Sequence, residues 1–341
     1  MRYVILVGIL LLISCQPMPT PIAIPSAAPK PVIFDGDMAH EDMFAALFLL
    51  QHPHVDLKAL TVVGTGEAHC APGMENLRGI VALAGRTGIP VTCGRDMPLA
   101  GDHVFPNEWR QRADEVYGVP LPSGVGGETA LSAPDLIIQV LQEAPEPVTI
   151  IATGPLTNIA EVVQTRPDLI PKIAGIFVMG GAVDVPGNIA VTGVGIANEV
   201  AEWNIYIDPL SVNVVLASGA PVILIPLDAT NYVPITRRFY DTLGNWQDTP
   251  AAQFVYQVLT ADMDFVESGG FQFWDSFTAA VAMDESLAKF EMREIVVTEE
   301  EGPESGWTRP TPGGYSVRVA VWGDAERYEA LLLTVLNRSE P

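Results

Sequence analysis

Short apolar runs alternate along this chain with longer stretches in which apolar residues recur every three or four positions. The short runs are rich in Val, Ile and Leu, which is typical of strands buried on both faces of a parallel sheet. The longer stretches have the spacing of amphipathic helices. The alternation predicts an open, mostly parallel α/β sheet with helices on both faces. Strands are predicted at 32–34, 57–63, 91–92, 148–152, 175–179 and 222–225, and helices at 74–84, 133–141, 156–164 and 210–217.

The pattern changes after residue 250, where strands no longer alternate regularly with helices. No Pro-, Gly- or Ser-rich break separates this part from the preceding residues, so the sequence predicts a single domain over 32–341. The elements expected in the last part are helices at 251–266, 276–283 and 325–336 and strands at 294–298 and 316–320.

An apolar stretch of a different kind opens the chain. Arg2 precedes an apolar run that is too short to span a bilayer, which is typical of an export signal. The residues ending at Cys15, Leu-Ile-Ser-Cys, resemble the bacterial lipobox, in which the Cys becomes lipidated; the alternative is an ordinary signal with an incidental Cys. We therefore expect a signal peptide at 1–14 and a Pro-rich tether at 15–31. The expected protein is exported and lipid-anchored to the bacterial cell envelope.

The chain is strongly acidic, with 18 Lys and Arg against 41 Asp and Glu and a net charge of −23. Loss of residues 1–14 removes one Arg and no acid, which gives 17 − 41 = −24. Phosphate groups would repel such a surface, so nucleic acid and anionic lipid are excluded as partners and the membrane is reached only through the anchor. The acidity itself is better explained by solubility or a salty habitat than by function.

Two cysteines remain besides Cys15. Cys70 and Cys93 lack the Cys-x-x-Cys spacing of a zinc site. In an oxidising compartment they could pair as a disulfide, but the sequence leaves open whether their backbones come close enough.

Four carboxylates follow the first predicted strand within eight residues: Asp35, Asp37, Glu41 and Asp42. They repel one another, and the N-terminus of the helix that follows offsets this only in part. A hard cation such as Ca²⁺, which takes oxygen ligands, would offset it far more. The alternative is an acidic N-cap on a surface helix.

Further polar motifs follow other predicted strands, at the sheet edge where α/β proteins bind their ligands. They are Ala-Thr-Gly-Pro-Leu-Thr-Asn at 152–158, Val-Met-Gly-Gly at 178–181, Ala-Glu-Trp-Asn at 201–204 and Phe-Trp-Asp at 273–275.

These motifs together, in this order and over about residues 32–281, resemble the calcium-dependent nucleoside hydrolases, the inosine–uridine preferring nucleoside N-ribohydrolases. The resemblance implies hydrolysis of the N-glycosidic bond of a ribonucleoside, with one Ca²⁺ at the bottom of the ribose pocket. It implies Asp37, Asp42, Asp275 and the backbone carbonyl of Thr153 as calcium ligands. Asp37 also matches the general base that deprotonates the calcium-bound water.

The same resemblance implies a set of sugar-binding residues. Carboxylate and amide groups that grip the 2′- and 3′-hydroxyls would reject deoxy analogues, because buried polar groups would lose their partners. The matching side chains are Asn188, Glu202 and Asn204, with Glu41 as a further candidate and Met179 lining the sugar pocket.

Three departures from the family pattern bear on activity. The family's Asp-Asp pair is Glu41-Asp42 here, which shifts one carboxylate by roughly an ångström. The usual Gly-Asn after the second strand is Gly-Thr-Gly-Glu at 64–67, so that either Thr65 or Glu67 takes over its ribose contact or the contact is lost. The His that several members place before the late Asp, where it protonates the leaving base, is Trp274.

An indole cannot donate a useful proton at neutral pH, but it can stack on a nucleobase. Purine-preferring members of the family use aromatic stacking in this way. Trp274 is therefore expected at the base, and Trp109 is a candidate for the second face; the alternative is that both rings only pack the protein.

Two other functions stay open. One is hydrolysis of a different ribosyl or glycosyl substrate, because the base-contacting loops match the family least. The other is a calcium-dependent riboside-binding lipoprotein without turnover. The two departures from the family pattern at Glu41 and Trp274 favour this alternative. Self-association is frequent in the family, so a homo-oligomer is also possible.

Overall fold

The computed structural model describes residues 22–24, 26–124 and 126–339. The predicted signal peptide, the lipidation site Cys15 and residues 15–21 and 25 of the predicted tether lie outside the described residues. The segment just before the first strand lies against the domain, since the Ile22 backbone N–H donates to Thr334 Oγ1 and the Ala27 N–H donates to His54 Nε2. Among the described residues, no helix has the length and apolar character needed to cross a bilayer.

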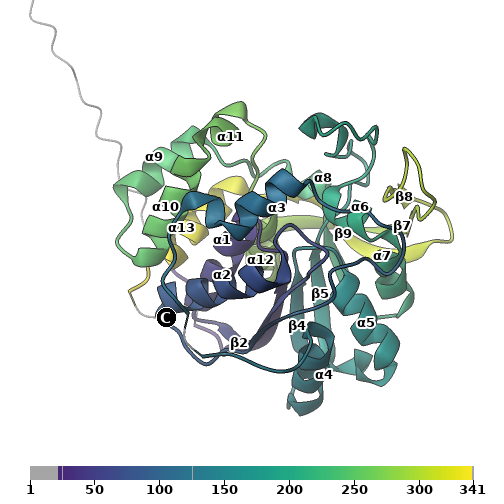
Figure 1. The fold of residues 1–341 in the computed structure, drawn as a ribbon, viewed down its shortest axis with the longest axis horizontal. Helices are drawn as coiled ribbons and strands as arrows, with labels where there is room; N and C mark the ends of the chain where they lie inside the picture. Colours follow the sequence, from purple (N-terminus) through teal and green to yellow (C-terminus); the bar gives the residue numbers. More distant parts are fainter. Residues whose placement is uncertain (1–21, 25, 125, 340–341) are drawn as a thin grey trace, which may run out of the picture.

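The fold is built on one nine-stranded sheet with the strand order β3-β2-β1-β4-β5-β6-β9-β7-β8 (Figure 1). The neighbouring strands from β3 to β9 are parallel, and β7 and β8 add an antiparallel edge. The predicted open, mostly parallel sheet is confirmed. The strands are β1 Lys30–Gly36, β2 Val55–Val62, β3 Val91–Cys93, β4 Val148–Ala152, β5 Ile173–Met179, β6 Val222–Ile225, β7 Ala288–Val297, β8 Thr308–Pro310 and β9 Tyr315–Gly323.

Helices cover both faces of the sheet, because successive residues of a strand point to opposite sides. In β1, Phe34 packs into a large core with α1, α2, α10, α12 and α13, whereas Ile33 packs into a second core with α4, α5 and α7. The helices are α1 His40–Gln51, α2 Cys70–Leu83, α3 Asn107–Asp114, α4 Ala133–Glu143, α5 Thr157–Thr165, α6 Trp203–Ile207, α7 Pro209–Ala217, α8 Leu227–Thr230, α9 Arg237–Asn245, α10 Pro250–Ala261, α11 Met263–Ser268, α12 Trp274–Met283 and α13 Ala325–Leu336.

Several predicted boundaries differ from the structure, among them those of β1, β7 and the helix predicted over 251–266. β1 already begins at Lys30, two residues before the predicted start of the domain. β7 begins at Ala288 rather than at 294, because its first half alternates exposed charged residues that hide its pairing with β9. The helix predicted over 251–266 is wrong as a single helix, since it breaks at Asp262 into α10 and α11.

The order of the strands places the carboxyl ends of β1 and β4 at a switch point. From β1 the chain moves outward to β2 and β3, then returns to pair β4 with the other side of β1. Crossover connections leave this point in opposite directions, so an opening forms beyond the strand ends, where open α/β sheets bind ligands. The acidic motif after β1 and Thr153 after β4 lie here.

Candidate active site

Three of the predicted metal ligands, Asp37, Asp42 and Asp275, lie together and are buried, with 3%, 0% and 3% of their surfaces exposed. The carboxyl group of Asp42 lies within hydrogen-bonding reach of the carboxyl groups of both Asp37 and Asp275. These residues come from the end of β1, the first turn of α1 and the first turn of α12. The structure therefore brings together side chains that are more than 200 residues apart in the sequence.

Backbone and hydroxyl donors hold the first two carboxylates in place. Asp42 Oδ1 accepts from Thr153 Oγ1 at 2.6 Å, and Asp42 Oδ2 accepts from the Ala39 N–H at 2.9 Å. Asp37 Oδ2 accepts from the Glu67 N–H at 3.2 Å. The turn between the two aspartates runs through Met38 at φ 66, in the left-handed region. This backbone reversal directs both carboxylates toward the same place.

Burial raises the pKa of all three carboxyl groups above the usual range. For Asp42 the neighbouring Asp275 and Asp37 charges add to the effect of burial, and for Asp275 those of Glu41 and Asp37 do so. For Asp37 burial is also the largest cause, and Glu41 adds to it. Within the described part of the chain, no Lys or Arg forms an ion pair with any of the three. The cluster lacks a positive charge from the protein itself.

The donor set fits a hard cation, since the three carboxyl groups and the hydroxyl and carbonyl of Thr153 all offer oxygen. The three carboxyl groups lie in contact with one another. Among the described residues, no three His, Cys, Asp or Glu side chains are arranged as in a formed metal site. The carbonyl of Thr153, the fourth predicted ligand, accepts from Asn204 Nδ2 at 3.1 Å. Buried carboxyl groups in contact are either protonated or charged with a cation between them, and the oxygen donors present are those that a hard cation takes.

Two of the predicted sugar-binding residues, Glu202 and Asn204, lie near the same place, since Asn204 donates to the Thr153 carbonyl and the Glu202 charge acts on Asp275. Glu202 caps α6 and accepts from the Asn204 and Gly181 N–H groups, both at 3.0 Å, and burial raises its pKa to about 7. Asn204 Nδ2 also donates to the Met179 carbonyl at 3.3 Å. Asn188 is less buried, and its Oδ1 accepts from the Trp203 N–H at 3.2 Å.

The two candidate stacking residues lie in different aromatic clusters. Trp109 packs edge-on against Trp203, with ring centroids 5.2 Å apart. Trp274 lies beside Met179 and near Phe271, at a centroid distance of 6.0 Å. The structure thus brings Trp274 to the predicted sugar pocket but shows no contact between Trp274 and Trp109 among the described residues. The indole Nε1 of Trp274 is buried without a hydrogen-bond partner.

The structure distinguishes the two candidates for the lost Gly-Asn contact. Thr65 is buried and its Oγ1 pairs with Thr157 Oγ1 at 3.1 Å, toward α5. Glu67 lies beside Asp37 and accepts from the Tyr117 hydroxyl at 2.8 Å. Burial raises the pKa of Glu67 to about 8, with the Asp37 and Glu41 charges adding to it. Of the two candidates, Glu67 is therefore the one that faces the acidic cluster.

His40 is buried next to the acidic cluster, a placement that the sequence did not reveal. Only 8% of it is exposed, and its Nε2 lies 2.6 Å from Asp262 Oδ2. Burial lowers the pKa of His40, but the Asp262 and Glu41 carboxylates outweigh burial and leave it raised. The partner is 222 residues away in the chain, so no local signal could have indicated it.

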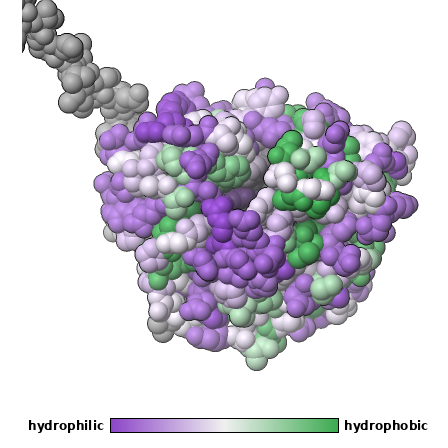
Figure 2. Space-filling view, turned by 45° about the horizontal axis from the view of Figure 1, so that its top comes forward, coloured by the Kyte–Doolittle hydropathy of each residue, from purple (hydrophilic) through white to green (hydrophobic). Residues whose placement is uncertain are grey.

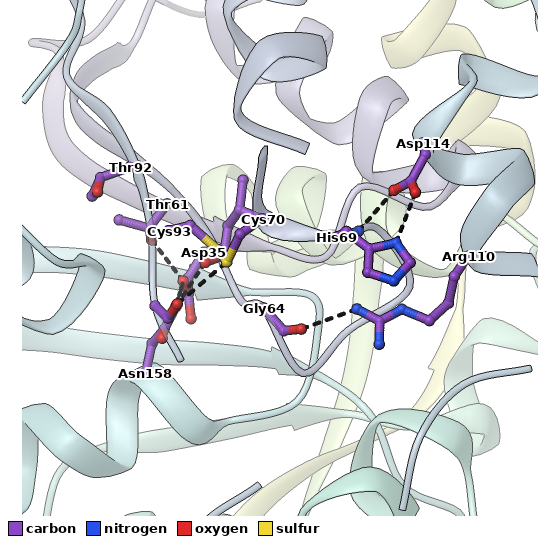
Figure 3. The surroundings of a disulfide bond; sticks show 12 residues. Asp35, Thr61, Gly64, His69, Cys70, Thr92, Cys93, Arg110, Asp114 and Asn158 are labelled. Atoms are coloured by element: carbon purple, nitrogen blue, oxygen red, sulfur yellow. Dashed lines mark hydrogen bonds and ion pairs between the residues drawn. A yellow bond between two sulfur atoms is a disulfide. The ribbon is translucent and has the colours of Figure 1, made fainter. Parts of the chain in front are cut away.

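Cys70 and Cys93 form a disulfide, with their Cα atoms 5.6 Å apart. Figure 3 shows it between the start of α2 and the end of β3, next to Asp35 and Gly64. Asp35 accepts from Thr61 Oγ1 at 2.6 Å and from Asn158 Nδ2 at 2.8 Å. The pairing that the sequence left open thus fastens the loop that carries Glu67.

We expect the double variant Cys70→Ser, Cys93→Ser to lose about 3 kcal/mol of unfolding free energy, the loop-closure value for a ring of this size. The two cysteines are 23 residues apart. Thermal melts of the oxidised and reduced wild type and of the variant would measure the loss. A variant as stable as the oxidised wild type would contradict it.

Figure 2 shows a hollow in the surface with a hydrophobic patch on one rim and hydrophilic residues on the other. A separate cavity of about 750 Å³ lies elsewhere, where Asn213 of α7 meets the loop between β7 and β8. It is lined by Glu299, Glu304 and Arg309 among others, and by none of the candidate site residues.

Fold and site define an α/β protein with an acidic, oxygen-rich ligand site of the kind that metal-assisted hydrolases use. The family model of the inosine-uridine preferring nucleoside hydrolases matches residues 32–330, and the chain belongs to this family. The protein is accordingly an N-glycosyl hydrolase of the nucleoside hydrolase kind.

Individual relatives agree with this assignment. The pyrimidine-specific ribonucleoside hydrolase RihA of Citrobacter koseri is 36% identical over 66% of this chain and 70% of its own length. A plant nucleoside hydrolase, PpNRh1, has a similar structure, with a TM-score of 0.81 and 28% identity over 91% of this chain and 99% of its own. The inosine-uridine preferring nucleoside hydrolase of Bacillus anthracis gives 0.79 and 26% over 90% and 99%.

Proposed function

We propose that this protein is an exported, lipid-anchored and calcium-dependent hydrolase that splits ribonucleosides into base and ribose. The observation that carries the calcium dependence is the contact among three buried carboxyl groups, Asp37, Asp42 and Asp275, at the switch point of the sheet. No cationic side chain is paired with them in the described residues. Ca²⁺ prefers such oxygen ligands.

The three carboxylates and the carbonyl of Thr153 would hold the ion. When bound, Ca²⁺ would neutralise the cluster and make a nearby water more acidic. Asp37, whose Oδ2 is held by the Glu67 N–H, would then accept a proton from the attacking water.

The sugar would be held by groups that converge on the carbonyl of Thr153. Asn204 already donates to this carbonyl, and Glu202 is fixed beside it by three backbone N–H groups. Glu41 and Asn188 would complete the contacts to the ribose hydroxyls. As the glycosidic bond breaks, positive charge develops on the sugar ring, and the surrounding carboxylates would stabilise it.

The leaving base would meet aromatic rather than acidic groups. Trp274 packs beside Met179, so the base would lie against this indole while the ribose occupies the polar pocket. Trp109, whose ring packs on Trp203 next to Glu202 and Asn204, would be the second face for the base.

Ribose release from a panel of purine and pyrimidine nucleosides tests the proposal. The protein without residues 1–15 would be assayed with Ca²⁺ and then with chelator. Calcium-dependent release supports the proposal and reveals the base preference. Release of another sugar, or calcium-dependent binding without release, would replace it with one of the two alternative functions.

We expect 2′-deoxyribonucleosides to be cleaved with a kcat/KM at least about 10²-fold below that of the matching ribonucleosides. Glu202 and Asn204 are buried, so a missing hydroxyl leaves polar groups without a partner. Paired assays of uridine and 2′-deoxyuridine, and of inosine and 2′-deoxyinosine, would measure the ratio. Similar rates on both sugars would remove these residues as the source of selectivity.

Export and lipid anchoring rest on the sequence before the described residues. The disulfide is consistent with an oxidising compartment, where such bonds persist. Fractionation of cells expressing the full chain would test the anchor: the protein should leave the membrane fraction when Cys15 is changed to Ala. Self-association stays a prediction, which sedimentation of the soluble protein would test.

A further inference from the structure

One carboxylate, that of Asp262, joins three segments that are far apart in the sequence. Its Oδ2 lies 2.6 Å from His40 Nε2 and 3.0 Å from Arg112 Nη2. His40 is the first residue of α1, Arg112 lies in α3, and Asp262 stands at the break between α10 and α11. The Asp262 side chain is only 13% exposed, so solvent screens these contacts little.

The imidazole of His40 is held on all sides. Its second nitrogen, Nδ1, lies 3.7 Å from Glu41 Oε2. One face of the ring stacks on Tyr117, with centroids 3.3 Å apart, and the Phe271 ring approaches it edge-on at 5.1 Å. The ring therefore has little freedom to turn, and the Nδ1 atom points to one place only.

Tyr117 extends the same group of contacts to the acidic cluster. Its hydroxyl donates to Glu67 at 2.8 Å, and the Arg112 guanidinium lies 5.2 Å from its ring centroid. Tyr117 and the preceding Val116 both have left-handed backbones, at φ 53 and 54. Such backbones are unfavourable for these residue types and persist where the surroundings fix them.

Asp262 also begins the aromatic segment that leads to Trp274. Phe265 and Phe271 stack at 4.6 Å, and both rings face Trp274 at 6.4 and 6.0 Å. The carboxylate that orients His40 thus also fixes the first residue of this segment. Asp262 is thus connected both to His40, next to the proposed sugar site, and to the aromatic segment next to the proposed base site.

We propose that Asp262 and His40 are positioning residues for hydrolysis: Asp262 orients the imidazole, and the imidazole holds the Glu41 carboxylate toward the sugar. This inference rests on the proposed function. A Glu side chain has one more rotatable bond than Asp, so its carboxylate needs an orienting partner more than Asp does. His40 supplies that partner beside the residue that departs from the family pattern.

The test compares Asp262→Asn, which keeps the shape and removes the charge, with His40→Ala and His40→Gln. We expect the first two variants to lower kcat/KM for a ribonucleoside by about tenfold or more, chiefly by raising KM, because a misplaced contact group weakens sugar binding. His40→Gln, which keeps a donor, should recover part of the loss. Calcium affinity should stay within about twofold of wild type, since neither residue is a proposed ligand.

A double-mutant cycle separates positioning from general stability. If His40 acts through Glu41, His40→Ala should cost at most about twofold in a Glu41→Asp background. The matched control is His69→Ala, which removes another histidine–carboxylate pair, at 2.7 Å from Asp114, without touching Glu41. It should change kcat/KM by less than about twofold. All variants would be assayed well below their melting temperatures, and His40→Gln carries the test if His40→Ala does not fold.

Unchanged KM and kcat in folded Asp262→Asn and His40→Ala would overturn the inference. An equal loss of kcat/KM from His40→Ala in the wild-type and the Glu41→Asp background would overturn it too. Binding of a C-nucleoside, whose carbon–carbon bond cannot be hydrolysed, keeps the two proposals apart. If the wild-type protein binds the C-nucleoside but cleaves no nucleoside, the proposed function is contradicted. The affinities of the variants for the C-nucleoside would still test the positioning. Variants that bind it as wild type does contradict the positioning alone.

Discussion

Changing Asp37 to Asn is expected to lower kcat by about 10³-fold or more while leaving the protein folded. The amide keeps the shape and can still accept from the Glu67 N–H, but it cannot take a proton from water. General-base catalysis alone is worth about 10² to 10⁴. Removal of one negative charge also weakens the oxygen site, so the assay would be run at saturating Ca²⁺ and the calcium affinity measured separately.

The matched control for Asp37→Asn is Asp208→Asn. Asp208 is equally buried, and it caps α7 by accepting from the Ser211 N–H, but it lies outside the three-carboxylate cluster. This variant is expected to lose some stability and to keep kcat within a few-fold of wild type. A kcat within tenfold of wild type for Asp37→Asn at saturating Ca²⁺ would show that Asp37 is not the base.

The elements that carry the site were predictable because their signals are local. β4 and β6 run over the predicted residues, since an uninterrupted apolar run is a property of neighbouring positions. The acidic motif and Thr153 were then placed at one edge by the parallel order of the strands, whereas Asp275, at the start of a helix, was assigned to the site by the family resemblance. In the structure Asp42 contacts both Thr153 and Asp275.

The contacts that the sequence could not indicate join residues with no pattern in common. The break at Asp262 interrupts a stretch with good helical periodicity, and there the Asp262 carboxylate contacts His40 of α1 and Arg112 of α3, which are far away in the sequence. The pairing of Cys70 with Cys93 depends on how far α2 and β3 stand apart, which spacing along the chain does not fix. Only the folded backbone determines both.

The aromatic residues show the same limit at the site. Trp274 was expected to stack on the base, and in the structure it packs against the small cluster that contains Met179; the stacking itself stays a prediction. No local pattern decides whether Trp109 faces the same pocket, since a ring near a loop packs wherever apolar surface is available. In the structure Trp109 joins Phe105 and Trp203 in a separate cluster.

Removal of calcium is expected to make stability fall as pH rises. Burial raises the pKa of Asp35 and Glu202 to about 7 and that of Glu67 to about 8. In an unfolded chain these groups titrate at about pH 4. At pH values between about 4 and the raised pKa values, the folded chain therefore holds protons that the unfolded chain has released. Stability therefore decreases with pH over this range, because the unfolded state binds fewer protons.

In chelator, we expect the unfolding free energy at pH 8 to be at least about 2 kcal/mol lower than at pH 5. A pKa difference of one between the folded and the unfolded chain corresponds to about 1.4 kcal/mol. Calcium should abolish or reverse the trend, because it binds the deprotonated carboxylates and its affinity rises with pH. Denaturant melts at pH 5, 6, 7 and 8, with Ca²⁺ and with chelator, would measure both curves.

Asp42→Asn is the informative variant for these curves. Its neutral amide removes the carboxyl group that contacts both Asp37 and Asp275, so the chelated variant should lose less stability between pH 5 and pH 8 than the chelated wild type does. Calcium should also stabilise this variant less, because a ligand is gone. Identical pH curves for wild type with and without Ca²⁺ would mean that the acidic cluster binds no ion, whatever its role in the reaction.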